Sequence, residues 1–214
     1  MRIAALLCTA ALLGGCNMIT SERPLFSAAD AAGQPQLRPG VWIGEKPDCQ
    51  IDEAKPRDQW PDCIDSWVVR PNEVVAARDK GKPPGAGDRY PIVLAKGDPA
   101  VLQIGLTNDA GAIGGYVYAG LKPLKRDERG RIIEYKLWPA LCGPPPKADP
   151  NDQGDGMVTS HPLDGLVIDK KNHDCVATDP APVRVSARLS EAWNDADGGS
   201  ADDGRARWVR DGER

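Results

Sequence analysis

Short apolar runs, separated by turn residues, recur along the chain between positions 41 and 138. The runs are rich in β-branched and aromatic residues, and glycine, proline, asparagine and aspartate stand between them. Runs of about four to eight such residues predict β-strands. The predicted strands cover residues 41–43, 64–70, 73–77, 90–95, 101–106, 116–121 and 131–138. Because the last four follow one another with short turns, the pattern predicts an antiparallel meander.

The last predicted strand indicates which of its faces is buried. Alternate side chains of a strand point to opposite faces of the sheet. One face then carries Ile132, Glu134, Lys136 and Trp138, and the other carries Ile133, Tyr135 and Leu137. Because the second set contains no charged residue, we expect it to face the core.

After residue 138 the pattern is less regular. Residues 143–156 contain four prolines, three aspartates and three glycines, a composition that predicts an exposed connection. The apolar runs 166–168 and 175–177 flank a polar turn at residues 169–172 and predict a small hairpin.

The segment 179–193 supports two interpretations. Apolar residues alternate with polar ones over positions 183–189, which is typical of a half-buried strand. However, Asp179 is a suitable N-cap, and Pro180 would occupy the first helical position. The residues at helical spacing are Val185, Leu189 and Ala192 or Trp193. We favour the helix.

The chain begins with the features of an export signal. Arg2 precedes an apolar run over residues 3–13, which is shorter than the roughly 20 residues that cross a bilayer. The run ends in Leu13-Gly14-Gly15-Cys16. This ending resembles the lipobox of bacterial lipoproteins, and the resemblance covers residues 1–17.

The resemblance implies a location and an anchor. Residues 1–15 would be a signal peptide recognised through Leu13, Gly14 and Gly15 and then removed, and Cys16 would be acylated. Several acyl chains, each contributing about 0.8 kcal/mol per CH₂, make such an anchor permanent. Asn17 stands where, in enteric bacteria, an aspartate holds lipoproteins in the inner membrane. The implied location is therefore the outer membrane, facing the periplasm, with an ordinary secreted protein as the alternative.

The lipobox also divides the chain. We expect residues 16–36 to form the lipidated N-terminus and a tether, of which residues 24–26 are apolar enough to pack on the domain. Residues 37–214 are expected to form a single β-rich domain. The whole chain resembles lipoproteins of proteobacterial envelopes.

Four cysteines remain once Cys8 is removed with the signal and Cys16 is acylated. They are Cys49, Cys63, Cys142 and Cys175. An even number in an exported protein predicts disulfides. Three pairings exist, and we favour Cys49 with Cys63 because residues 50–62 have little apolar material to hold them. Cys142 with Cys175 then follows by elimination. Zinc is the alternative, but no C-x-x-C spacing supports it.

These patterns predict a mainly β protein of the α+β class, with an antiparallel meander sheet, one C-terminal helix and two disulfides. The charge balance is 27 Lys and Arg against 31 Asp and Glu, a net charge of −4. The basic runs 122–131 and 205–210 are interrupted by acidic or apolar residues, so they predict solvated strand faces. Nucleic acid is excluded as a partner, because no continuous basic stripe exists to neutralise phosphates.

Catalytic motifs are missing from the sequence. The two histidines, His161 and His173, are accompanied by no G-x-S-x-G, H-E-x-x-H or S-x-x-K motif. We interpret both as turn residues and expect no enzymatic activity. The acidic loops 149–154 and 195–203 match a calcium loop only in part, the first having Ser160 where a glutamate is required. We therefore expect no metal and no cofactor.

Tryptophan is the unusual feature of the composition, with six against one phenylalanine. The six are Trp42, Trp60, Trp67, Trp138, Trp193 and Trp208. Tryptophan would supply much of the apolar area of the core. Trp60, in the polar cysteine loop, and Trp208, among arginines, are expected to be exposed and are the candidate ligand platform.

The expected function is a binding or structural accessory role in the envelope. Its partners would be outer-membrane lipid, through acylated Cys16, and an envelope protein or glycan. The alternative is an envelope hydrolase or a glycan-binding accessory with a tryptophan-lined site.

Overall fold

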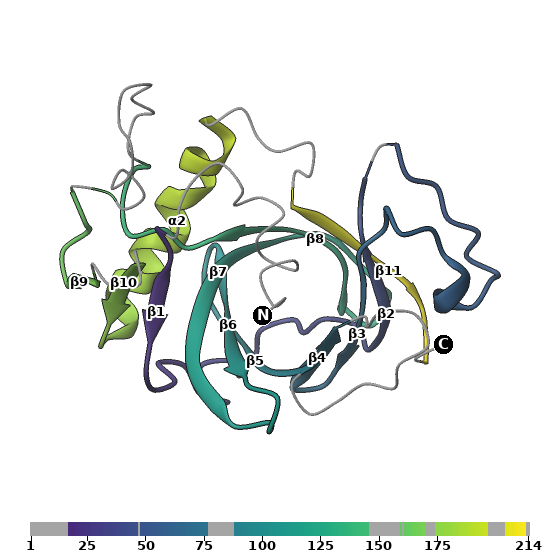
Figure 1. Ribbon diagram of the computed structural model, residues 1–214, viewed down its shortest axis with the longest axis horizontal. Helices are drawn as coiled ribbons and strands as arrows, with labels where there is room; N and C mark the ends of the chain where they lie inside the picture. Colours follow the sequence, from purple (N-terminus) through teal and green to yellow (C-terminus); the bar gives the residue numbers. More distant parts are fainter. Residues whose placement is uncertain are drawn as a thin grey trace.

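A ring of antiparallel strands forms the centre of the computed structural model (Figure 1). The structure describes residues 17–46, 48–76, 88–145, 159, 161–169, 174–196 and 204–212. The ring strands are β2 (Gly40–Gly44), β3 (Ser66–Arg70), β4 (Glu73–Ala76), β5 (Arg89–Ala95), β6 (Ala100–Thr107), β7 (Ile113–Arg126), β8 (Ile132–Pro139) and β11 (Arg205–Arg210). Each is hydrogen-bonded to its neighbours in the order β6-β5-β4-β3-β2-β11-β8-β7, and pairing of β6 with β7 closes the barrel.

Three more strands extend the sheet from β7. They are β1 (Ile19–Ser21), β10 (Asp174–Ala177) and β9 (Leu166–Asp169), and β10 with β9 is the predicted hairpin. In the described part of the chain, the other elements are helix α2 (Pro180–Ala196) and a short 3₁₀ turn, η1 (Arg57–Gln59). The predicted meander is confirmed as β5 to β8, as is the mainly β fold with one helix near the C-terminus. The predicted connection 143–156 lies outside the described residues apart from 143–145.

The interior of the barrel holds a contiguous hydrophobic cluster with members from every ring strand but β4, whose half-buried Val74 packs against it. Its aromatic members are Trp42, Trp67 and Tyr135, and the rings of Trp42 and Tyr135 lie 5.1 Å apart between centroids. An eight-stranded barrel is just wide enough for side chains to fill it. The interior is therefore a core, and a binding site has to be sought on the outside.

A bulge changes the predicted faces of β8. Tyr135 and Leu137 pack in the interior cluster as expected, but Ile132 joins them and Ile133 does not. Between Ile132 and Glu134, β8 advances by two residues while its partner β7 advances by one. The extra residue reverses the alternation of side chains beyond it. The expected core position of Ile133 is therefore wrong, and Ile132 occupies it.

The helix predicted for residues 179–193 is confirmed as α2. Pro180 is its first residue, and the Asp179 carboxylate accepts the backbone N–H of Ala181 at 2.7 Å. Two of the apolar residues at helical spacing, Val185 and Leu189, are 45% and 40% exposed and therefore do not form the buried face of the helix. The side chains that are fully buried against the barrel are Val183, Ser186, Ala187 and Ser190.

Hydrogen bonds explain why serines occupy the buried face of α2. Ser186 Oγ donates to the Leu141 carbonyl at 2.7 Å, and the Leu141 N–H donates to Ser190 Oγ at 2.9 Å. Trp138 Nε1 donates to the Ala187 carbonyl at 2.7 Å. Small residues let the helix backbone approach β8 closely, and the serines pair polar backbone groups that would otherwise be buried without partners.

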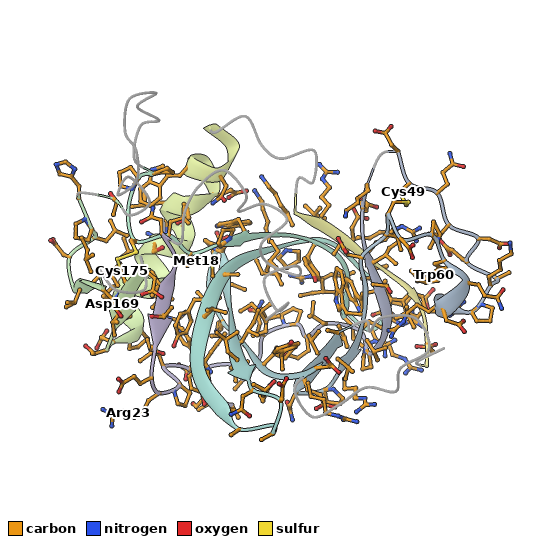
Figure 2. The ribbon with its side chains drawn as sticks, viewed as in Figure 1. Met18, Arg23, Cys49, Trp60, Asp169 and Cys175 are labelled. Atoms are coloured by element: carbon orange, nitrogen blue, oxygen red, sulfur yellow. A yellow bond between two sulfur atoms is a disulfide. The ribbon has the colours of Figure 1, made fainter. Side chains whose placement is uncertain are left out.

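The opposite side of the barrel is covered by the loop that follows β2. Trp60 packs there with Val41, Ile43, Val68 and Val75 on the outward faces of β2, β3 and β4. The predicted disulfide Cys49–Cys63 closes this loop, and Cys142–Cys175 ties the end of β8 to β10. Figure 2 shows Cys175 and Met18 on the side of the barrel where α2 lies, and Cys49 and Trp60 on the other side.

Residues 17–36 pack on the barrel instead of extending as a tether. Asn17 is 4% exposed and Ile19 is fully buried in β1. The backbone N–H groups of Leu25 and Phe26 donate to Gln103 Oε1 at 2.8 and 2.9 Å, and Gln103 Nε2 donates to the Phe26 carbonyl at 3.0 Å. The docking expected at residues 24–26 is confirmed, and the first described residue already belongs to the domain.

Candidate functional site

Several residues that the sequence singled out lie outside the described part of the chain. They are Leu13, Gly14, Gly15, Cys16, His173, the loop 149–154 and residues 197–203 of the second acidic loop. Their roles stay predictions. His161 is exposed in a bend, where its backbone N–H donates to Thr159 Oγ1 at 3.1 Å. This agrees with the turn position expected for it.

Trp60 is not an exposed platform. Its side chain is 3% exposed, and its Nε1 donates to the Asp52 carbonyl at 3.1 Å. The Arg210 guanidinium lies 5.2 Å from the centroid of the ring. The expected exposure of Trp60 is therefore wrong. Within the cysteine loop, the indole is the largest apolar side chain that packs on the barrel, and Ile51 packs beside it.

Trp208, the second predicted platform residue, is half-buried. The inner part of its ring packs on the barrel cluster, and the Arg38 guanidinium lies 3.5 Å from the ring centroid. Its Nε1 donates to the Pro39 carbonyl at 3.1 Å. Because an arginine covers the ring, Trp208 offers no open face for a sugar. It serves instead as the support on which Arg38 rests.

Arg38 lines a cleft of about 530 Å³ that lies beside the turn between β7 and β8. The lining residues are Arg38, Arg126, Asp127, Glu128, Arg129, Arg131 and Asp211. They come from three parts of the chain: the loop before β2, the β7–β8 turn and the residue after β11. We call this the arginine cleft.

The β7–β8 turn is organised around Asp127. Its Oδ1 accepts the backbone N–H groups of Arg129 and Arg131 at 3.0 and 2.9 Å, and Gly130 adopts a positive φ of 76°. Its Oδ2 accepts Nε and Nη2 of the Arg131 side chain, each at 2.7 Å. An aspartate that bonds its own backbone two residues ahead is a turn-forming device. Asp127 therefore fixes both the turn and one arginine of the cleft.

Asp127 is ionised because its pKa lies below the ordinary value of 3.8. Burial acts in the opposite direction and is the largest influence, but the combined hydrogen bonds from the Arg131 side chain and from the N–H groups of Arg131 and Arg129 outweigh it. The cleft thus carries a negative charge at Asp127, which is paired with Arg131.

Arg38 is held rigidly at its backbone and at its side chain. Its N–H donates to the Ile132 carbonyl and its carbonyl accepts Trp42 Nε1, both at 2.9 Å. Its Nη2 donates to Asp211 Oδ2 at 3.0 Å, and its Nη1 lies 3.9 Å from Asp127 Oδ2. Its buried Nε makes no hydrogen bond with any described residue. Arg38 is therefore a fixed cation in the wall of the cleft.

Arg126 and Arg129 are the cations that remain available to a ligand. Both are exposed, and neither is paired with another residue of the described chain. The guanidinium group donates two parallel hydrogen bonds to a phosphate or carboxylate. Four arginines face three carboxylates around the cleft, which leaves it with one excess positive charge. This arrangement suits the binding of an anionic group.

The sequence patterns did not predict the arginine cleft. They predicted a solvated strand face over residues 122–131, which fits the exposure of Arg126 and Arg129 but not their grouping with Arg38. Arg38 and Asp211, which are bonded to each other, stand 173 positions apart. The local signal was Asp127 followed by Gly130, a turn that gathers the neighbouring arginines.

Neither a metal-binding group nor a membrane-spanning helix occurs among the residues that the structure describes. Among the residues it describes, no group of three or more His, Cys, Asp or Glu side chains is placed to hold a metal ion. No helix in the described ranges is both long enough and apolar enough to cross a membrane. Comparisons of the chain with protein-family models, with curated proteins and with solved structures find no match.

Proposed function

We propose that this chain is a lipid-anchored binding protein of the bacterial cell envelope, and that its arginine cleft binds anionic groups of an envelope partner. The anchor is acylated Cys16 in the outer membrane, and the domain faces the periplasm. The observation that carries the binding role concerns two guanidinium groups beside the fixed Arg38. These groups, on Arg126 and Arg129, form no ion pair with any described residue.

Binding is favoured over catalysis by the residues that line the cleft. The pKa of the Asp127 carboxyl is lowered, so this group is held ionised. A general acid or base needs a pKa near the working pH. The cleft lining also contains no serine, cysteine or histidine that could act as a nucleophile or base. An accessory role, in which an anionic group is held without being transformed, fits these side chains.

The tryptophan-lined glycan site is the weaker alternative. Trp60 is buried under the cysteine loop, and Trp208 is covered by Arg38. Stacking of a sugar requires an open ring face, and neither of these two rings offers one. We therefore expect recognition to depend on charge.

Titration with inorganic pyrophosphate tests the cleft. We expect calorimetry to give a Kd of about 1 mM or tighter, equivalent to about −4 kcal/mol, and NMR signals of residues 126–131 to shift. The double variant Arg126→Gln, Arg129→Gln should weaken binding roughly tenfold or more. Because both side chains are exposed and unpaired, the variant should keep its fold.

The matched control is Arg188→Gln, which removes an exposed, unpaired arginine from α2. It should leave pyrophosphate binding unchanged. Equal affinities in the native protein and the cleft variant, or no binding by either, would refute the anion-binding role.

The anchor is tested separately by mass spectrometry of the mature N-terminal peptide. An acylated Cys16 supports the anchor. With Cys16→Ser we expect an uncleaved, unlipidated precursor, and a processed soluble product would contradict the proposal.

A further inference from the structure

The outer face of α2 is an apolar stripe that no described residue covers. Val185 and Leu189 are 45% and 40% exposed, and Ala181 and Ala192 are exposed beside them. These positions repeat every three or four residues and so lie on one side of the helix. The barrel-facing side is the opposite one, with Ser186, Ala187 and Ser190.

The charges in the middle of α2, over residues 185–191, favour a negatively charged surface as its partner. Arg188 stands between Val185 and Leu189, is exposed, and forms no ion pair within the described chain. Glu191, which would oppose it, is neutralised by Lys122 at 3.6 Å and Lys136 at 3.9 Å. An apolar stripe that carries an unpaired arginine is typical of helices that lie in the interface of anionic membranes.

The position of Asn17 indicates where the chain enters the domain. Its carbonyl accepts the Cys142 N–H at 2.8 Å, its Nδ2 donates to the Gly143 carbonyl at 3.1 Å, and its Oδ1 accepts the Thr159 N–H at 3.1 Å. Asn17 is thus fixed on the domain. The next residue, Met18, is paired with Leu141, which is the residue that bonds the serines of α2.

This inference rests on the proposed lipid anchor at Cys16. A lipidated Cys16 would be separated from the buried Asn17 by a single peptide unit, and consecutive Cα atoms are about 3.8 Å apart. The bilayer surface then has to lie against the side of the barrel where α2 packs. Helix α2, about 25 Å long at 1.5 Å per residue, extends along that side (Figure 1).

We propose that the outer face of α2 rests in the headgroup region of an anionic bilayer, with Val185 and Leu189 in contact with lipid. Strand β8 runs from Ile132, next to the arginine cleft, to Trp138, under α2. That distance is about 20 Å at 3.3 Å per residue. A bilayer against α2 would therefore leave the arginine cleft about 20 Å away, at the other end of β8, where it is open to the periplasm.

The test uses the mature chain with Cys16→Ser, exported as a soluble protein behind a secretory signal whose removal does not require lipidation in place of residues 1–15, so that binding cannot come from the acyl anchor. Vesicles of phosphatidylethanolamine and phosphatidylglycerol with a photoactivatable acyl chain are added, and lipid adducts are mapped by mass spectrometry. We expect adducts on residues 185–193, and the variant Val185→Asp, Leu189→Asp should lower both adduct yield and vesicle partition about tenfold. Both side chains are exposed, so the fold should survive.

The control is Val167→Asp, which adds one negative charge, against two in the α2 variant, at a valine of β9 that is 68% exposed. It should bind vesicles like the unchanged protein. Adducts concentrated on the β7–β8 turn, or equal partition of both variants, would overturn the proposal. So would a dimer in solution that the α2 variant dissociates, since α2 would then be an interface between copies. If Cys16 proves unacylated in cells while α2 still binds vesicles, the proposed lipid anchor is refuted and the proposed membrane contact of α2 is retained.

Discussion

Trp138 on β8 lies directly opposite Gly120 on β7, and its indole occupies the space that a side chain at position 120 would need. A β-carbon placed on Gly120 would overlap Cε2 and Nε1 of the indole. The absence of this carbon lets the ring lie across β7 and donate its Nε1 hydrogen to the Ala187 carbonyl of α2. One glycine therefore sets the distance between barrel and helix.

We predict that Gly120→Ala destabilises the protein by about 1–3 kcal/mol, the usual cost of overpacking. The matched control is Gly114→Ala in the same strand, where a β-carbon meets nothing within 4 Å. It should change the free energy of unfolding by less than about 1 kcal/mol. Urea denaturation followed by tryptophan fluorescence measures both. Equal effects of the two substitutions would contradict the proposed packing.

Ser190→Ala is predicted to destabilise the protein by about 1–3 kcal/mol, because it leaves the Leu141 N–H without its acceptor. Arg188→Ala, a change on the exposed face of the same helix, should cost less than about 0.5 kcal/mol. Hydrogen exchange of the Leu141 amide provides a second measurement, and we expect it to accelerate in Ser190→Ala alone. Unchanged exchange would indicate that the serine is not the partner that protects it.

The sequence predicted what depends on local patterns. Apolar runs between turn residues located the strands, and Asp179 with Pro180 located the start of α2. It could not predict the buried face of α2, because Ser186 and Ser190 are buried through a backbone that lies 45 and 49 positions away. Hydrophobicity alone would place the valine and leucine inside and the serines outside.

The same limit applies to the site. Trp60 was expected to be exposed because its neighbours in sequence are polar, yet its partners are valines of β2, β3 and β4. In the arginine cleft, Arg38 is hydrogen-bonded to Asp211, which lies 173 positions away in the sequence. Long-range pairing of charged residues leaves no periodic signal, so this site becomes visible only after the barrel has closed.

The two disulfides should differ in their effects. Cys142→Ser with Cys175→Ser opens a loop of 33 residues and should cost about 4 kcal/mol, whereas Cys49→Ser with Cys63→Ser opens one of 14 and should cost about 3 kcal/mol. The first pair holds β10 next to β1, and the second closes only the outer loop. Hydrogen exchange at residues 19–21 should therefore become faster only when the Cys142–Cys175 pair is removed. The opposite pattern would contradict this assignment.

Docking of the cysteine loop should depend on Arg210. Its Nη1 donates to the carbonyls of Glu53 and Lys55, and its guanidinium lies over Trp60. We predict that Arg210→Met accelerates hydrogen exchange over residues 50–60 several-fold and shifts Trp60 emission to longer wavelength. Arg205→Met, a change in an exposed side chain of the same strand, is the control. If both variants exchange alike, Arg210 does not hold the loop.

Asp127 should make the stability of the protein depend on pH in the acidic range. The pKa of this carboxyl is lower in the folded chain than its ordinary value of 3.8, so the folded state binds its proton less tightly than the unfolded state does. The resulting stabilisation is fully present above about pH 5, one unit or so above the unfolded pKa, and is lost as the pH falls through the folded pKa. Asp127→Asn removes it at every pH.

We therefore predict that Asp127→Asn is less stable than the native protein at pH 7, and that the difference shrinks as the pH falls from about 5 to below 3. Urea denaturation of both proteins across this range gives the difference directly. The comparison cancels the contribution of Asp30, whose pKa is also lowered, chiefly by hydrogen bonds from Ser27. A difference that stays constant with pH would show that the Asp127 carboxylate stabilises the β7–β8 turn through its shape, with no contribution from its charge.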